Sequence, residues 1–390
     1  MLTNVTLSVQ KMRRVVKSET KPFIERNKGI LQAHFRTKKS TIVKTLTALT
    51  DPVYKEKELS GYEKFWMRFM NDERDLPFIH LLTLIHLTVV PVAVLLFTNV
   101  FTGWIWWAVA VVYFYFAQFY LKGRFGLMFH CLCHRKSFKP KYQKWVHTYI
   151  TWIICPLFGH APEGYFAHHM GMHHVENNND EDASSTMHYQ RDSLKSFLAY
   201  FFNFLFLGFK ETFVYLFNRK RKKLYTRLTV GEWVFIFFCV GMCFVDLKAT
   251  MVVWVVPFFF ARLVMMFGNW TQHSFIDQND PENLYTNSIN CINTKYNQIC
   301  WNDGHHIIHH LRPGLHYTEM PGEFLKRKDE FAAKKAVVFD GIHYLHIFTF
   351  LMTKRYDKLA DNLVNINNMF DSREQAINLM RGRTRRIEAA

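Results

Sequence analysis

The sequence has few cysteines. The seven lie at positions 131, 133, 155, 239, 243, 291 and 300, and no two of them form a C-x-x-C pair. Their spacing gives no disulfide framework of the kind found in small secreted domains, so we expect free thiols facing a reducing compartment. The stretch MLTNVTLSVQKMRR at the start of the sequence also lacks the continuous apolar run of a signal peptide.

Acidic residues are scarce as well. The chain has 32 Asp and Glu against 49 Lys and Arg, a formal net charge of +17. Such an excess is typical of a nucleic-acid-binding protein or of a membrane protein with basic flanks on its cytosolic side. The apolar residues are concentrated in a few long runs, which favours the membrane protein. We therefore expect no nucleic-acid partner.

Four apolar runs are candidates for crossing a bilayer core, which requires about 20 residues. In chain order they are 78–98, 103–121, 231–245 and 249–268. Short turns join the first to the second and the third to the fourth, so they form two transmembrane hairpins. Residues 1–77 are then a cytosolic N-terminal region, 78–320 a membrane domain and 321–390 a cytosolic helical C-terminal region.

Two further apolar stretches are ambiguous. Residues 145–159 are too short to cross comfortably, and 197–217 carry Lys210 and Glu211. We expect both to be helices at the cytosolic interface. Crossing by either one alone would also put the histidine clusters described below on opposite sides of the membrane.

Basic residues predict the orientation. The turn 99–102 has no Lys or Arg, whereas NRKRKK (218–223) precedes the second hairpin. By the positive-inside rule, both termini and the central loop face the cytosol. The endoplasmic reticulum is the default membrane, and a plastid or bacterial inner membrane is the alternative. In the N-terminal region, 37–52 is typical of a linker and 61–70 of a helix on the membrane surface.

Histidines are concentrated in three boxes. HCLCH holds two of them four residues apart, HHMGMHH contains H-x3-HH, and HHIIHH contains H-x2-HH. One more lies in NWTQH, just past the fourth apolar run. The nine candidate metal ligands are His130, His134, His169, His173, His174, His273, His306, His309 and His310. His168 and His305 are alternates within their boxes.

Helical geometry predicts how these rings group. Residues four apart share one helix face, so His130 and His134 should point together, as should His169 and His173. Adjacent residues diverge by about 100° on a helix, so His173 and His174 suit two neighbouring ions better than one. Nine imidazoles also exceed the roughly four ligands that a zinc ion takes. The spacing predicts a dinuclear site.

Several metals accept imidazole, including iron, zinc, copper and nickel. The sequence has no E-x-x-H, the pair used by soluble di-iron bundles, and no HExxH, the usual zinc-protease motif. Acids near the boxes are better candidates for accepting hydrogen bonds from ligand imidazoles. They are Glu163, Glu176, Asp180, Asp182 and Asp303. For each acid singly, a solvated loop charge is the alternative.

The order of the boxes resembles the membrane fatty acid desaturase superfamily over roughly residues 80–316. NWTQH resembles an element of stearoyl-CoA-type desaturases in which the histidine binds metal and the asparagine contacts it through water. Those roles fall on His273 and Asn269. The resemblance implies an all-α integral membrane protein in which four transmembrane helices, in two hairpins, carry a cytosolic helical cap. It also implies two iron ions in the cap, O2 as oxidant, and electrons from cytochrome b5 or ferredoxin.

Two departures concern the substrate and the donor. HCLCH is neither HDxxH nor HRxxH, the usual first boxes of lipid- and CoA-acting members. The resemblance therefore leaves both a membrane lipid and an acyl-CoA open as substrate. No HPGG haem-binding signature is present, so we expect the donor to be a separate protein, and a basic cytosolic surface suits an acidic one.

An alkyl C–H bond has no acidity that a side-chain base can use, so its oxidation requires the metal and O2. The sequence predicts a lipid desaturase that introduces a double bond into an acyl chain held in a tunnel between the helices. One alternative is a fatty acyl, sphingoid or sterol hydroxylase with the same di-iron site, which product analysis distinguishes. A membrane zinc protein, hydrolase or receptor-like, is the other, and metal content decides that case.

Overall fold

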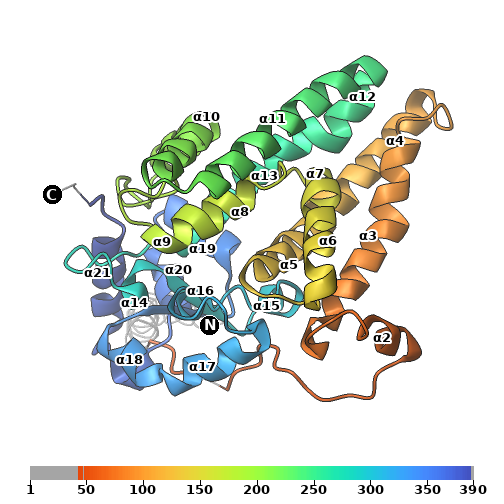
Figure 1. Cartoon of the computed structure of the whole chain (residues 1–390). Coiled ribbons are helices and arrows are strands. Elements are labelled where there is room, and N and C mark those ends of the chain that lie inside the picture. Colours follow the sequence, from red (N-terminus) through yellow and green to blue (C-terminus); the bar gives the residue numbers. More distant parts are fainter. Residues whose placement is uncertain (1–42, 47, 388–390) are drawn as a thin grey trace, which may run out of the picture.

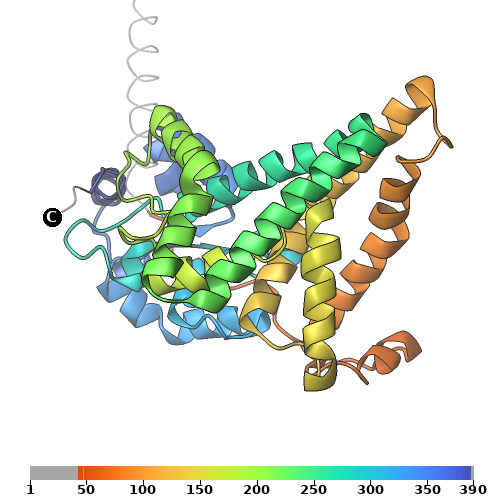
Figure 2. The same ribbon diagram turned by 45° about the horizontal axis from the view of Figure 1, so that its top comes forward.

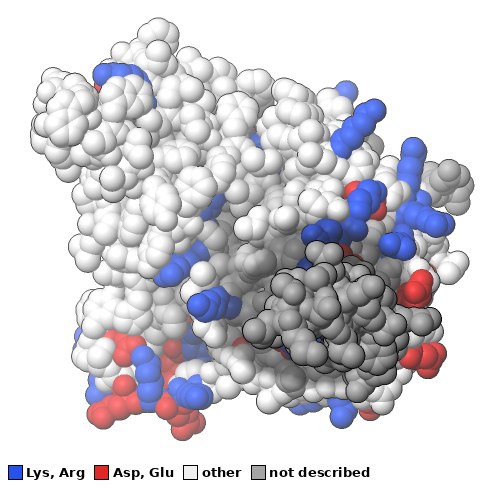
Figure 3. All heavy atoms as spheres, turned by 180° about the vertical axis from the view of Figure 1, so that it is seen from behind, with Lys and Arg blue, Asp and Glu red and all other residues white. Residues whose placement is uncertain are grey.

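The computed structural model describes residues 43–46 and 48–387. The described chain is mostly helical (Figures 1 and 2). Long helices extend side by side toward one end of the molecule, and short helices with a small sheet gather at the other. Figure 3 shows one face, on which charged side chains gather around the short-helix end while the long-helix end is largely uncharged.

Five helical segments among the described residues are long and apolar enough to cross a membrane. They are Glu73–Leu95, Gly103–His134, Leu194–Asn218, Lys222–Val245 and Leu247–Gln272. Four of them contain all or most of a run predicted to cross, and Leu194–Asn218 contains one of the two stretches predicted to lie at the interface. Length and composition therefore indicate an integral membrane protein, with one candidate more than the four predicted.

The first two segments form a hairpin whose second helix is longer than predicted. α3 (Leu76–Leu95) is followed by α4 (Gly103–Tyr115), a π-helical stretch (Phe116–Leu121) and α5 (Lys122–His134). The helix thus continues beyond position 121, and its last turns carry the first histidine box.

The second hairpin also ends at candidate ligands. It comprises α11 (Lys222–Val245), α12 (Leu247–Thr250), a π-helical stretch (Met251–Val255) and α13 (Val256–Gln272). His273 follows directly. The 25-residue α10 (Leu194–Asn218) precedes this hairpin and runs in a different direction from α11 and α13 (Figures 1 and 2).

A shorter helix stands beside the first hairpin. It consists of α6 (Pro140–Tyr149), a π-helical stretch (Ile150–Ile154) and α7 (Cys155–Leu157). Its final carbonyls are buried and would otherwise be unpaired. Gln118 Nε2 donates to Leu157 O at 2.9 Å, and Lys122 Nζ donates to Phe158 O at 2.5 Å. The second helix of the hairpin therefore caps this one.

The short-helix end contains a two-stranded parallel sheet that the all-α prediction missed. β1 (Ile289–Ile292) pairs with β2 (Val337–Asp340), with Ile289 opposite Val337, and both strands are buried throughout. The remaining elements are α2 (Gly61–Trp66), Glu73–Asp75, α8 (Gly164–His168), His169–His173, α9 (His174–Glu176), α14 (Leu284–Asn287), α15 (Lys295–Ile299), α16 (His306–Leu311), Tyr317–Glu319, α17 (Met320–Lys326), α18 (Lys328–Ala333), α19 (Tyr344–Met352), α20 (Tyr356–Asn362), Ile366–Asn368 and α21 (Arg373–Arg383).

The segment before α2 packs against this end of the molecule. Val43 and Asp51 are buried, and Lys44 forms a β-bridge with Val364. The linker predicted over 37–52 is therefore wrong for the part that the structure describes; the rest of that range lies outside the described residues. The helix predicted within 61–70 is present as α2.

Candidate metal centre

The three histidine boxes and His273 come from four elements that end close together. The first box lies on the last turns of α5, so the rings of His130 and His134 face each other with centroids 5.0 Å apart. The second box runs from the end of α8 through a π-helical turn into α9. The third lies on α16.

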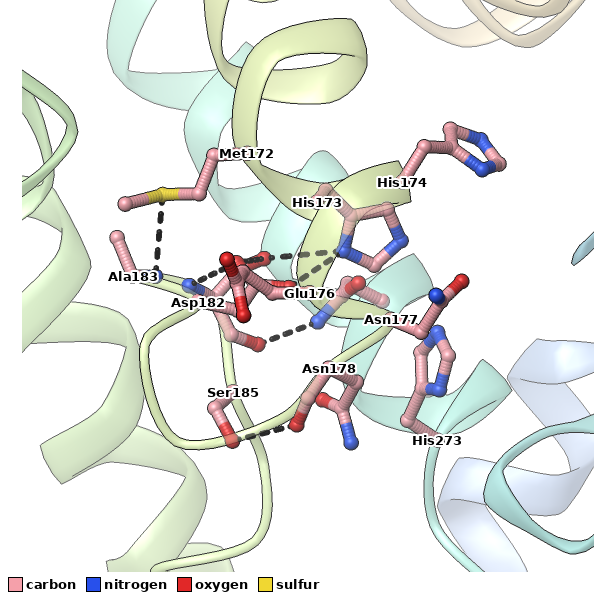
Figure 4. A network of polar contacts seen from close by, with 12 residues as sticks. Met172, His173, His174, Glu176, Asn177, Asn178, Asp182, Ala183, Ser185 and His273 are labelled. Carbon is pink, nitrogen blue, oxygen red and sulfur yellow. Dashed lines mark hydrogen bonds and ion pairs between the residues drawn. The ribbon is translucent and has the colours of Figure 1, made fainter. Parts of the chain in front are cut away.

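All nine candidate ligands lie in two adjacent groups, in which the nitrogens of each group are within 4.8 Å of one another. The five-histidine group is His130, His134, His169, His174 and His309. The four-histidine group is His173, His273, His306 and His310. Both adjacent pairs are divided between the groups, as the helical spacing predicts. Figure 4 shows the first of these pairs, with His173 directed toward Asp182 and His174 pointing away.

One predicted pairing is wrong. His169 and His173 belong to different groups, and the partner of His169 is His174, whose Nε2 lies 3.0 Å from His169 Nε2. The reason is local backbone geometry. Residues 169–173 form a π-helical turn, and the His174 N–H bonds to the His169 carbonyl five residues earlier. The wider turn places residues five apart, and not four, on one face.

The distances between ring nitrogens fit a bound metal. In the five-histidine group, Nε2 atoms of neighbouring rings lie 2.9 Å (His130 and His309), 3.0 Å (His134 and His169) and 2.8 Å (His174 and His309) apart. Two nitrogens about 2.1 Å from one ion, at right angles, are about 3.0 Å apart. His273 Nε2 is buried without a hydrogen-bond partner, which suits an atom that points at a cation.

The protonation state of the rings also fits. Burial, followed by the charge of neighbouring imidazoles, lowers the pKa of His306, His309 and His310 well below the usual value. The same causes lower the pKa of His169 and His174. Neutral imidazole offers a lone pair, which is the form that binds metal. The donor set can therefore hold two soft-to-borderline cations side by side.

Several outer contacts orient the ligand rings. Asp182 Oδ2 lies 2.7 Å from His173 Nδ1, as predicted for an acid behind a ligand (Figure 4). Burial alone would raise the pKa of Asp182, but His173 and His168 lower it well below its usual value. Asp303 is more remote, with Oδ1 3.9 Å from His130 Nδ1, and burial raises its pKa to about 6.

Two asparagines perform this orienting role where the sequence had suggested acids. His310 Nδ1 lies 3.0 Å from Asn177 Oδ1, and His273 Nδ1 lies 2.9 Å from the Asn287 carbonyl oxygen. Asn177 lies in ENNND, directly after the second box, so its position in the sequence indicated that it could contact a ligand. Asn287 is the last residue of α14 and lies outside every box, so its position offered no such indication.

The other three acids do not contact the candidate ligands. Glu163 pairs with Arg227 and accepts from the Trp152 indole, and Asp180 faces His188. Glu176 is likewise paired outside both groups. The prediction that Glu163 and Asp180 support ligand imidazoles is therefore wrong. Each of these acids has a partner outside the two groups, which proximity in sequence does not determine.

The remaining candidates lie beside the centre. Asn269 Nδ2 donates to Ser184 O and to Tyr200 Oη, both at 2.8 Å. Its predicted contact with metal through water stays a prediction. His168 and His305, the alternates, belong to neither group.

An apolar cavity of about 290 Å³ opens onto both groups of histidines. His130 and His169 line it from one group, and His173 and His306 from the other. Its walls come mainly from α5 and α13, and Lys122 is among the lining residues. That residue lies eight positions before His130, or about 12 Å along a helix. The volume is near the lower end of ligand pockets, about 300–1,000 Å³.

This arrangement agrees with a comparison to protein families. The model of the fatty acid desaturase family matches residues 105–340, more than half of the chain. The chain belongs to the fatty acid desaturase family. The residues matched by the family model include every candidate ligand. Comparisons with curated proteins and with solved structures found no match.

Membership has consequences for the chemistry. The family carries out lipid modification of the desaturase or hydroxylase type. Membership implies that the protein is an oxygen-dependent oxidoreductase. The family is known for di-iron centres, and the two histidine groups of this desaturase-family protein are compatible with a metal site.

Proposed function

We propose that the protein is an O2-dependent lipid desaturase that introduces a double bond into an acyl chain, using two iron ions and electrons from a separate donor. The observation that carries this proposal is the pair of histidine groups, adjacent to each other and open to one apolar cavity. Membership of the fatty acid desaturase family supports it.

The histidines of the two groups would bind metal, and the residues that line the cavity would bind substrate. The five-histidine group would hold one iron and the four-histidine group the other, and two irons bound there would supply, with O2, the oxidising power that side chains lack. Asp182, Asn177 and Asn287 fix the tautomer and direction of the rings they contact. The cavity excludes water and determines which carbons of an alkyl chain lie beside the histidines.

The positions of the histidines support four membrane crossings. The rings of His173 and His273 are 5.4 Å apart, so both lie on one side of the membrane. An even number of crossings must therefore separate them in the chain. Three candidate segments do so, which means that at most two of them cross. α11 and α13 extend from α12 as the two arms of a hairpin, whereas α10 takes another direction (Figure 2), which supports α10 as the helix that lies at the interface.

We further propose that the short-helix end forms a cytosolic cap on the endoplasmic reticulum membrane. NRKRKK, between α10 and α11, supports this orientation because basic flanks stay on the cytosolic side. The substrate is then a membrane lipid or an acyl-CoA, and the donor is cytochrome b5 or ferredoxin. The basic net charge suits an acidic donor.

The test combines metal content with lipid profiling. Purified protein should contain two iron ions per chain, and cells that express it should gain an unsaturated lipid only in the presence of O2. A variant with His173 and His309 both replaced by alanine should lose iron and product together. A hydroxylated product would select the hydroxylase alternative. About one zinc, no iron and no dependence on O2 would refute the oxidative function.

A further inference from the structure

The third histidine box is attached to the rest of the protein through two buried carboxylates that precede the residues matched by the family. Asp51 Oδ2 lies 2.9 Å from His305 Nε2, and Asp75 Oδ1 lies 3.1 Å from His316 Nε2. His305 directly precedes α16 and His316 follows shortly after its end. The two contacts therefore bracket the helix that carries His306, His309 and His310.

In the first contact, Asp51 accepts hydrogen bonds from several groups. Its Oδ1 accepts from the Asn293 N–H and from Asn297 Nδ2, both at 2.9 Å. Asn297 Oδ1 in turn accepts from the Gly304 N–H at 2.9 Å. One carboxylate thus fixes the end of β1, α15 and the entry into α16. Asp51 is 6% exposed and His305 is fully buried, so water cannot substitute for these bonds.

Asp75 makes the second contact from the start of α3. His316 Nδ1 accepts from the Thr318 N–H at 3.2 Å, which leaves Nε2 as the ring nitrogen that donates to Asp75. Both partners are at most 1% exposed. The contact ties the chain leaving α16 to the first transmembrane hairpin.

α16 depends on such contacts because it is short. It has six residues, and isolated helices shorter than about 12–15 residues are marginal in water. Its three rings nevertheless serve both histidine groups: His309 belongs to one and the other two belong to the second. Metal–ligand distances tolerate only about 0.2 Å of deviation, so a small movement of this helix would disturb both ions.

We propose that Asp51 and Asp75 are positioning residues of the metal centre, which hold α16 where its imidazoles reach both ions. The proposal rests on the function proposed above. It also assigns Asp51 and Asp75, which lie outside the family match, to the working site. Neither carboxylate touches metal or substrate, so both act through His305 and His316.

The test measures metal affinity in the full-length protein. Protein in detergent is stripped with a chelator and titrated with Co²⁺, whose visible spectrum reports ligand geometry. In Asp51→Asn, an NH2 group replaces one carboxylate oxygen. This group donates hydrogen bonds, but the neighbouring groups of Asn293, Asn297 and His305 are donors too. In Asp75→Ala, the His316 N–H loses its acceptor. We expect each variant to bind Co²⁺ about 10-fold more weakly, the lower range for outer contacts of metal ligands, with an altered spectrum.

Asp192→Asn is the matched control. Asp192 is a buried carboxylate that accepts from Gln190, Tyr356 and Lys354 and has no contact with α16. Its replacement should lower the melting temperature without changing Co²⁺ affinity. Asp51→Glu, which keeps the charge and shifts it by one methylene, serves if the asparagine variant folds poorly, and it should also weaken binding.

The outcomes separate this proposal from the proposed function. Wild-type affinity and spectrum in the Asp51 and Asp75 variants would overturn the positioning role, as would an equal loss in Asp192→Asn. If the wild-type protein itself fails to bind two ions, the proposed function fails first. Two ions bound by the wild type and a loss confined to the Asp51 and Asp75 variants would support both.

Discussion

The side chains of His173 and His174 leave the backbone in different directions, and those of His309 and His310 do the same. The ring centroids are 5.6 Å apart in the first pair and 5.7 Å apart in the second. Each adjacent pair therefore gives one ring to either group, and the two groups lie against each other. Two sites built in this way share their backbone supports while keeping separate ligands.

Separate ligands make the loss of one histidine specific. Replacing His310 by alanine removes a donor from the four-histidine group only, so we expect iron content to fall toward one ion per chain. Product formation should drop at least about 100-fold, beyond the range for losing an outer contact. His188→Ala is the control, because His188 faces Asp180 outside both groups. Full retention of two irons in His310→Ala would argue against it as a ligand.

Gly126 controls the free space of the cavity. It lines the cavity one helical turn before His130, and an added Cβ there would meet no atom within 4 Å. A phenylalanine at this position would fill part of the cavity and displace the substrate. We expect Gly126→Phe to lower product formation by about 100-fold, a cost typical of misplacement near the reacting atoms, with iron content unchanged.

Gly241→Phe provides the comparison for that variant. Gly241 is an exposed helix position on α11, also with no atom within 4 Å of an added Cβ, and it does not line the cavity. It should retain wild-type product formation. Equal activity in the two variants would show that the substrate does not use this cavity.

Spacing in the sequence identified the histidines that meet but not everything that supports them. Boxes of two or three rings on short helices can be read directly, because helical periodicity is local. Support for the rings depends on the direction of loop side chains. Asp182 and Asp180 are two residues apart, yet only Asp182 reaches a ligand, and Asn287 comes from a different element, α14.

Among the elements, π-helical stretches account for the main difference between prediction and structure. One lies within the second histidine box, at 169–173, and others interrupt the helices at 116–121 and 251–255. A rule based on 3.6 residues per turn cannot anticipate them, so it paired His169 with the wrong neighbour. π-helical turns often occur at functional sites, which agrees with the position of the one at 169–173.

The contact of α11 with the chain entering α8 depends on a glycine. A Cβ added at Gly231 would lie 1.8 Å from the Pro162 carbonyl oxygen, and the second histidine box begins shortly beyond that point. We expect Gly231→Ala to destabilise the protein by about 3 kcal/mol, the upper end of overpacking costs, and to reduce iron content. Thermal unfolding in detergent measures the first effect and metal analysis the second.

A matched variant lies on the same helix. Gly241→Ala adds the same methyl group where no atom lies within 4 Å. Because alanine favours helix over glycine by about 1 kcal/mol, it should leave stability equal or slightly raised. A melting temperature for Gly231→Ala as high as that of Gly241→Ala would disprove the close approach.

For the whole molecule, the sequence predicted the hairpins better than the cap. Continuous apolar runs are a strong local signal, and all four lie in long helices. The parallel pairing of β1 with β2 joins residues far apart in the chain, and the burial of Asp51 requires partners near residue 300. Such contacts are set by tertiary packing, which short sequence windows do not contain.

The position of α10 determines the topology, and labelling can test it. The seven native cysteines are buried or only partly exposed. A single exposed cysteine introduced into the protein should therefore react with an impermeant maleimide in sealed vesicles more readily than the native ones. Lys195→Cys, in the first turn of α10, and Lys223→Cys, at the start of α11, should react from the same face, because a helix at the interface leaves both ends on one side. Asn99→Cys and Lys248→Cys, at the turns of the two hairpins, should react only from the other face. Reaction of Lys195→Cys and Lys223→Cys from opposite faces would mean that α10 crosses, and if α11 and α13 also cross, the rings of His173 and His273 could not meet.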